Sequence, residues 1–157
     1  MKTTVEDMLK KSVEAHKASQ FQEADKLYKL ILQEQPKHPD ANHHMGILAV
    51  ETGKIKESLP FFKTAIAAKP TVIQFWVSYI DALIKLERKG DAKSVLDQVK
   101  QRGAKGETFD QLELRIAQPK VDETKSSSQI VQQSENILDN LELDQAIKLA
   151  YKKAKKI

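Results

Sequence analysis

The sequence repeats itself at an interval of 34 residues, and this period limits the possible folds more than any other feature. Pro36 and Pro70 lie one interval apart, and Ser12 and Gly46 form a second pair. Four further columns keep the interval through three copies: Ala15, Ala49 and Leu83; Ala24, Ser58 and Ala92; Tyr28, Phe62 and Leu96; and Ile31, Ala65 and Val99. A fixed period of this length is typical of proteins that stack one supersecondary unit repeatedly.

Each unit is predicted to consist of two antiparallel helices. Residues that favour helices are abundant, whereas glycine and proline number only five each. Pro36 and Pro70 lack the N–H group that a helix interior needs, so each ends a helix, and Gly53 supplies a tight turn between two apolar runs. The expected helices span residues 4–18, 21–34, 39–52, 55–68, 72–87 and 91–102.

The columns of the repeat also predict how these helices pack. Small residues let two helices approach closely, and bulky residues such as Tyr28 fill the space between neighbouring pairs. Trp76 lies at a position of the same kind, so we expect it in the core rather than on a ligand-binding surface. A two-helix unit cannot bury its apolar face alone, and the predicted fold is therefore an all-α solenoid of stacked units. A seventh helix at 107–117, beyond Gly103 and Gly106, would cover the exposed end of the stack.

These features resemble the tetratricopeptide repeat (TPR) family, with units at about 5–38, 39–72 and 73–106 and residues 107–117 as a cap. The residues that carry the resemblance are Ser12, Phe21, Ala24, Tyr28 and Pro36 in the first unit, Met45, Gly46, Ala49, Gly53, Ile55, Ser58, Phe62, Ala65 and Pro70 in the second, and Trp76, Tyr79, Leu83, Ala92, Leu96 and Val99 in the third. The resemblance implies a right-handed superhelix of helix-turn-helix repeats that binds other proteins.

Four positions depart from the pattern of this family. Lys11 stands where an apolar residue is expected, Ser19 and Glu87 replace turn glycines, and Ala104 stands where a third proline would fall. All four lie toward the ends of the array, so the central unit remains the best match.

Composition and motifs exclude several classes of function. The chain has no cysteine, which rules out disulfides and thiol catalysis. It has no glycine-rich phosphate loop, nucleophile elbow or His-Glu-x-x-His pair, so we expect no enzyme activity and no cofactor. There is no signal-peptide-like start and no apolar run of membrane-spanning length, and we therefore expect a cytoplasmic location away from the membrane.

The histidines do not predict a metal site. His43 and His44 are adjacent, so on a helix their side chains point about 100° apart and cannot chelate one ion together. His16 and His43 could both face the inner surface from neighbouring helices, but two nitrogen ligands without a third make a poor transition-metal site. We expect these histidines to be polar groups on the wall of a groove.

The positive charge of the chain lies at its C-terminal end. Residues 144–157 contain five lysines and one aspartate, whereas residues 1–143 contain equal numbers of acidic and basic residues. Lysines near the end of a helix interact favourably with its dipole, and this is the favoured interpretation. Five lysines without interleaved aromatic residues attract nucleic acid only weakly, so a nucleic-acid partner is not expected.

The resemblance implies that the first helix of each unit lines a concave groove. Carried over by position, the residues expected to bind a protein partner are Leu9, Val13, His16, Lys17, Asp40, His43, Ile47, Val50, Gln74, Val77, Asp81 and Ile84, with Glu51 and Lys85 beside them. This surface has an apolar floor and polar edges, which suits an amphipathic helix or an extended apolar peptide. The alternative is that part of the floor simply packs against the next helix. The leading prediction of function is a scaffold or adaptor for protein–protein interaction.

One subclass of the family captures the acidic C-termini of heat-shock chaperones with a clamp of basic and amide side chains. The matching positions here hold Leu9, Val13, His44, Gln74 and Ser78, and none of them is a lysine, arginine or asparagine. We therefore expect no such clamp.

The C-terminal part leaves several alternatives open. Residues 118–128 read as a linker and residues 129–157 as helical, either a degenerate fourth repeat or one long amphipathic helix. This segment could fold back onto the groove or mediate self-association. A second functional interpretation is that the chain is the non-catalytic TPR portion of a larger bacterial glycosyltransferase or sulfotransferase, because residues 75–86 and 103–106 resemble segments of such proteins.

Overall fold

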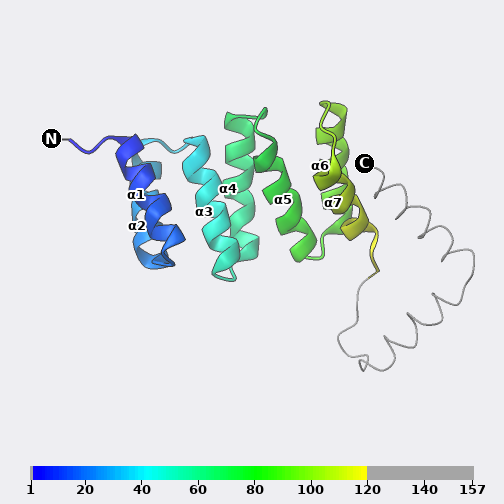
Figure 1. The fold of residues 1–157 in the computed structure, drawn as a ribbon, viewed down its shortest axis with the longest axis horizontal. Coiled ribbons are helices and arrows are strands. Elements are labelled where there is room, and N and C mark those ends of the chain that lie inside the picture. The colour runs from blue at the N-terminus through cyan, green and yellow to red at the C-terminus, as the bar shows by residue number, and fades with distance from the viewer. Residues whose placement is uncertain (1, 120–157) are drawn as a thin grey trace, which may run out of the picture. The chain divides into compact units, whose positions relative to one another are not determined.

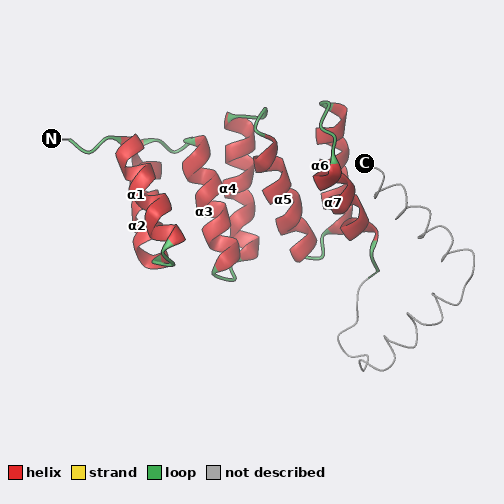
Figure 2. Ribbon diagram, in the orientation of Figure 1, coloured by secondary structure: helices red, strands yellow, loops and turns green. Residues whose placement is uncertain are grey.

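The computed structural model describes residues 2–119, and the expectations for residues 120–157 lie outside this range. The chain divides into two units, Met1–Gln118 and Pro119–Ile157, and the first contains all the described helices. Figure 1 and Figure 2 show these helices following one another as antiparallel pairs. They are α1 (Val5–Lys17), α2 (Phe21–Glu34), α3 (Pro39–Glu51), α4 (Ile55–Ala68), α5 (Ile73–Lys85), α6 (Lys89–Gln101) and α7 (Glu107–Ala117). No strand occurs between residues 2 and 119, so the all-helical prediction is confirmed.

The expected helix ranges agree with the structure to within two residues at every end. Two differences have a clear cause. Helix α5 ends at Lys85 because Glu87 leaves helical geometry with a positive φ of 59°. Helix α6 begins at Lys89 rather than residue 91. Gly90 adopts helical geometry in its first turn, where an added Cβ would meet nothing within 4 Å.

Each pair of helices is joined by the same left-handed turn. Ser19, Gly53 and Glu87 lie one repeat apart and have φ values of 59°, 82° and 59°. In each turn the next N–H group donates to a carbonyl five residues earlier: Gln20 to Ala15 at 2.9 Å, Lys54 to Ala49 at 2.7 Å, and Arg88 to Leu83 at 2.9 Å. These bonds satisfy the last carbonyls of the first helix. The two non-glycine turns therefore keep the geometry of the glycine turn.

The connections between units use the prolines. Asn42 Nδ2 donates to the carbonyl of Pro36 at 3.1 Å, and Trp76 Nε1, at the same position of the next unit, donates to the carbonyl of Pro70 at 2.8 Å. Trp76 is 5% exposed, which confirms its predicted place in the core. After α6, where a third proline is missing, Gly103 makes the turn with a φ of 95°.

Close packing within a pair depends on the small residues of the repeat. A Cβ added at Gly46 would lie 2.5 Å from Phe62 Cε1, so the α3–α4 contact requires the absence of a side chain. Ser12, at the equivalent position of the first unit, is fully buried and its hydroxyl donates to the carbonyl of Met8 at 2.6 Å. Ala24, Ser58 and Ala92 are likewise buried, as the period predicts.

The first helices of successive pairs approach one another directly. Helix α1 contacts α3, α3 contacts α5, and α5 contacts α7, whereas within residues 2–119 no contact joins α2 to α4 or α4 to α6. The first helices therefore lie on the inner side of the array and the second helices on the outer side. We call the surface formed by α1, α3 and α5 the inner face.

The two ends of the array differ in chemistry. Asp7, Lys11 and Glu14 are exposed on α1, where the equivalent residues of α3 (Ala41, Met45 and Leu48) are buried against the preceding unit. Helix α7 begins 34 residues after α5 and packs against α5 and α6. Its Leu114 is 66% exposed because, within the described residues, no second helix packs on α7.

Candidate functional site

Twelve of the fourteen predicted groove residues fall into three groups on the inner face. Half-buried apolar side chains are Leu9, Val13, Ile47, Val50 and Val77. Half-buried polar ones are His16, Asp40 and Asp81, and exposed ones are Lys17, Glu51, Gln74 and Lys85. The inner face thus presents an apolar strip between polar and charged groups.

Two of the predicted residues, His43 and Ile84, lie in the interior instead. His43 is 6% exposed, its Nε2 lies 2.8 Å from Ser78 Oγ, and its ring packs 4.7 Å from that of Phe75 and 5.8 Å from that of Phe62. Ile84 belongs to the core cluster around α5 and α6. These side chains position the inner face but do not contribute to its accessible surface.

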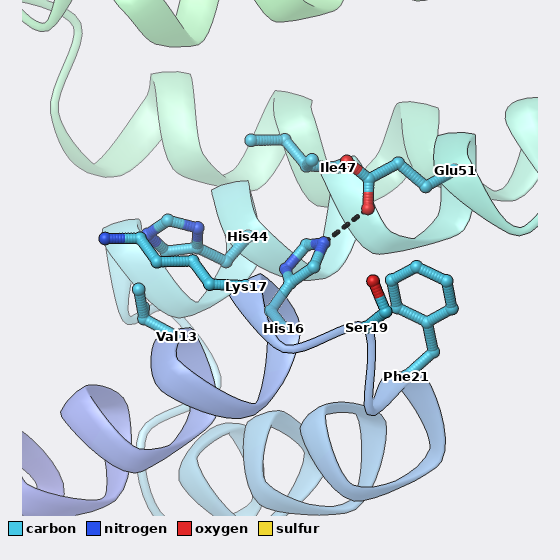
Figure 3. A pocket seen from close by; sticks show the side chains of 8 residues that line it. All are labelled: Val13, His16, Lys17, Ser19, Phe21, His44, Ile47 and Glu51. Carbon is cyan, nitrogen blue, oxygen red and sulfur yellow. Dashed lines mark hydrogen bonds and ion pairs between the residues drawn. The ribbon is translucent and has the colours of Figure 1, made fainter.

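A hollow of about 460 Å³ lies between the first and second units (Figure 3). We call it the histidine hollow. Its lining residues are Val13, His16, Lys17, Ser19, Phe21, His44, Ile47 and Glu51. They come from α1, from the turn after it, from the first residue of α2 and from α3. The hollow is therefore an open, partly apolar site built from two units.

A hydrogen bond crosses the rim of the histidine hollow. His16 Nε2 lies 2.5 Å from a carboxylate oxygen of Glu51, and Figure 3 shows this interaction joining α1 to α3. The other ring nitrogen, Nδ1, lies 3.4 Å from the hydroxyl of Tyr28. Helix α2 thus holds His16 from below, and Glu51 holds it from the neighbouring unit.

Aromatic rings continue from this hollow into the core. The ring of His16 lies edge-on to Phe21 at 5.9 Å and to Tyr28 at 6.2 Å. Tyr28 stacks on His44 with ring centroids 5.8 Å apart and an interplanar angle of 4°. His44 in turn lies 5.7 Å from His43. These distances and angles are those that aromatic pairs prefer, so the rings that line the hollow also pack against one another and the core.

Burial sets the protonation of these groups. It lowers the pKa of His43 to about 4, with a smaller lowering from His44. Burial also lowers the pKa of His44, an effect that Asp40 opposes and that His16 and Lys17 reinforce. The pKa of Tyr28 rises to about 12 through burial and the nearby carboxylate of Glu51. His43 is therefore neutral at physiological pH.

A second hollow, of about 210 Å³, lies between α5 and α7. Its central charge is Asp81, whose carboxylate lies 2.7 Å from Arg115 and 3.0 Å from Lys85. Burial alone would raise the pKa of Asp81, but hydrogen bonds from Arg115 and Lys85 hold that pKa below its ordinary value. Helix α7 thus contributes a cation to the inner face as well as covering the end of the stack.

Comparison with known proteins gives matches only at the level of structure. No protein-family model matches the sequence, and no curated protein matches it. The TPR2B domain of yeast Sti1, solved as a complex with pHsp70, matches with a TM-score of 0.64 and 17% identity over 72% of this chain and 95% of that one. The Sgt2 TPR domain of Aspergillus fumigatus matches with a TM-score of 0.62 and 16% identity over 80% and 93%. PilF of Pseudomonas aeruginosa matches with a TM-score of 0.63 and 15% identity over 93% and 67%.

This chain has the TPR fold. The period, the small-residue columns and the prolines that indicated a TPR array from the sequence all have a place in the structure: Gly46 against Phe62, and Pro36 and Pro70 at the connections between units. Lys11, which departs from the family pattern, lies on the surface of α1 where Asp7 and Glu14 are also exposed.

Several contributors to the inner face of this TPR array were not among the predicted site residues. Phe21, Ser19 and His44 line the histidine hollow, and Arg115 reaches Asp81 from α7. The sequence offered a signal for Phe21, which belongs to the repeat pattern, but none for the position of its ring above the inner face. Arg115 follows from the 34-residue spacing of α7, which places it one repeat after Asp81.

Among residues 2–119, no group of three histidine or acidic side chains is placed to hold a metal ion. Within the same range, none of the helices combines the length and the apolar character that a membrane span requires. What the face offers is apolar surface, hydrogen-bonding groups and charges of both signs.

Proposed function

We propose that this protein is a non-enzymatic adaptor whose inner face binds a segment of another polypeptide. One observation carries the proposal: half-buried apolar side chains run along the first helices of three consecutive units. They are Leu9 and Val13 on α1, Ile47 and Val50 on α3, and Val77 on α5. Apolar surface arranged in a continuous strip between polar edges is typical of a peptide-binding groove.

The segment that suits this face is an amphipathic helix or an extended chain with apolar side chains on one side. The charges beside the strip have both signs, with Lys17 and Lys85 against Asp40, Glu51 and Asp81. A partner with a single strong charge is therefore not favoured. Burial of the apolar strip would supply most of the affinity, and the polar edges would set the orientation.

The fold of the Sti1 domain, which was solved with pHsp70, supports peptide binding in general terms. The five clamp positions hold Leu9, Val13, His44, Gln74 and Ser78, none of which is a cation. The Ser78 hydroxyl is engaged by His43 and Gln74, at 2.8 Å and 3.4 Å. A free C-terminal carboxylate would find no clamp here.

Selection of peptides on the full chain tests the proposal. A phage-displayed library of random 16-residue peptides provides binders, and fluorescence polarisation measures their Kd for the wild type and for variants of the inner face. We expect Ile47→Glu and Val77→Glu to raise the Kd at least about 10-fold, because each places a charge in the apolar strip. Gln74→Glu places a charge at an exposed position of the same face, so a change in the Kd of this variant reports on the inner face without disturbance of the core.

Leu30→Glu is the matched control. Leu30 is 48% exposed on α2 and lines neither hollow of the inner face, so its replacement should leave the Kd within about twofold. Failure to select any binder would refute the proposal. Binders that are equally insensitive to the variants of the inner face and to Leu30→Glu would also refute it.

A further inference from the structure

The histidine hollow differs from the rest of the inner face in its walls. Three rings line it, those of Phe21, His16 and His44, together with the apolar side chains of Val13 and Ile47. The other half-buried apolar residues of the predicted groove are aliphatic: Leu9, Val50 and Val77. Aromatic rings prefer edge-on or offset contacts with other rings, so this hollow favours an aromatic guest over an aliphatic one.

The charges at the rim are also unequal in their availability. The carboxylate of Glu51 is engaged by His16 at 2.5 Å. Lys17 is exposed and has no carboxylate within salt-bridge distance among residues 2–119. Figure 3 places Lys17 beside His44, and its positive charge contributes to the lowered pKa of His44. The unsatisfied charge at the mouth of the hollow is therefore positive.

A side chain bound in the hollow must also form hydrogen bonds with the polar groups at the rim. Glu51 uses one carboxylate oxygen for His16, which leaves acceptor capacity at the rim. A phenol or an indole would bury its ring in the hollow and donate its O–H or N–H group toward this carboxylate. The hollow of about 460 Å³ has room for such a side chain.

From this geometry we propose that the histidine hollow anchors the partner through one tyrosine or tryptophan side chain, and that an acidic side chain of the same segment pairs with Lys17. This inference rests on the proposed function, since it names the anchor within the same inner face. The acidic group is a side chain within the segment and not a free C-terminus, because the clamp positions carry no cation.

The test uses the full chain and the peptides selected on it. We expect the selected sequences to share a tyrosine or tryptophan with an aspartate or glutamate within about one helical turn of it. In synthetic versions of a selected peptide, replacing the aromatic residue by leucine should raise the Kd about 10-fold or more. Replacing the acidic residue by glutamine should raise it about threefold to fivefold at low salt, and less at high salt.

Charge reversal then assigns the acidic contact to Lys17. Lys17→Glu should weaken the acidic peptide about 10-fold and restore binding to a version of the peptide that carries lysine in place of the acid. Lys10→Glu is the matched control: Lys10 is also exposed on α1 but lies on a different surface, with Asp7, Lys11 and Glu14. It should change neither Kd by more than about twofold.

The outcomes separate the two proposals. If Ile47→Glu and Val77→Glu abolish binding while Lys17→Glu and the aromatic replacement do not, the adaptor function stands and the anchor is wrong. If selection yields only aliphatic segments without acids, the anchor is wrong as well. If no variant of the inner face matters, or no peptide is selected, both proposals fall.

Discussion

Replacing Gly46 with alanine tests whether close packing of α3 on α4 holds the central unit together. The added Cβ would lie 2.5, 2.7 and 2.9 Å from three ring carbons of Phe62, whereas ordinary carbon contacts exceed about 3.4 Å. Phe62 is only 1% exposed, so its ring has no free space into which it can move. Overpacking of a close-packed core typically costs about 1–3 kcal/mol, and because this ring cannot move aside we expect the upper end, about 3 kcal/mol.

The net effect follows from two opposing contributions. Alanine is favoured over glycine inside a helix by about 1 kcal/mol. Subtracting this gain leaves a destabilisation of about 2 kcal/mol for Gly46→Ala, which corresponds to a fall in Tm of roughly 8 °C for an array of this size. Thermal and urea unfolding, followed by circular dichroism at 222 nm, measure both quantities.

The chain offers a matched control and a rescue. Gly90 also lies in a helix, but a Cβ there meets nothing within 4 Å, so Gly90→Ala should stabilise by up to about 1 kcal/mol. In a Phe62→Leu background, Gly46→Ala should become neutral or stabilising, because the smaller side chain removes the clash. A Tm of Gly46→Ala within 1–2 °C of the wild type, or an equal loss in both backgrounds, would refute the packing argument.

The remaining predictions concern turns, protonation and one buried hydrogen bond. Ser19→Gly and Glu87→Gly should each raise the free energy of unfolding by about 0.5–1 kcal/mol, because both turns have a positive φ of 59°; urea titration checks this. The pKa of His43 is about 4 in the fold against 6.5 in the unfolded chain. The buried neutral ring therefore stabilises the fold fully above about pH 6.5, and this stabilisation is lost as the pH falls toward 4. The free energy of unfolding should fall by about 3 kcal/mol across this pH range, and it should change less with pH in the His43→Phe variant. Trp76→Phe removes the donor to Pro70 and should cost about 1–2 kcal/mol, measured by circular dichroism.

Most of the fold could be predicted because each repeat contains, within its own sequence, the residues that determine its helix ends and its close helix contacts. Gly46, Pro36 and Pro70 occur where a close contact or a helix end requires them, and the three copies report the same structure independently. The start of α6 was predicted two residues late. Glycine usually indicates a break in a helix, but Gly90 lies in the first turn of α6, where an added Cβ would contact nothing within 4 Å.

The site was less predictable because its chemistry depends on neighbours from other units. Position in the repeat placed His43 on the inner face, but Phe62 and Phe75 enclose its ring and Ser78 satisfies its nitrogen. In the same way, nothing near His16 in the sequence indicates its contact with Glu51, which lies 35 residues away. Such contacts exist only once two units are stacked.

The absence of contacts between α2 and α4 and between α4 and α6, within the described residues, has a mechanical consequence. Successive units are joined by the packing of each second helix on the next first helix and, to a smaller extent, by contacts between first helices. No contact between the second helices of neighbouring units opposes a change in their spacing. The curvature of the inner face is therefore set by the core clusters that cross from one unit to the next, where Tyr28 meets Met45 and Phe62 meets Trp76.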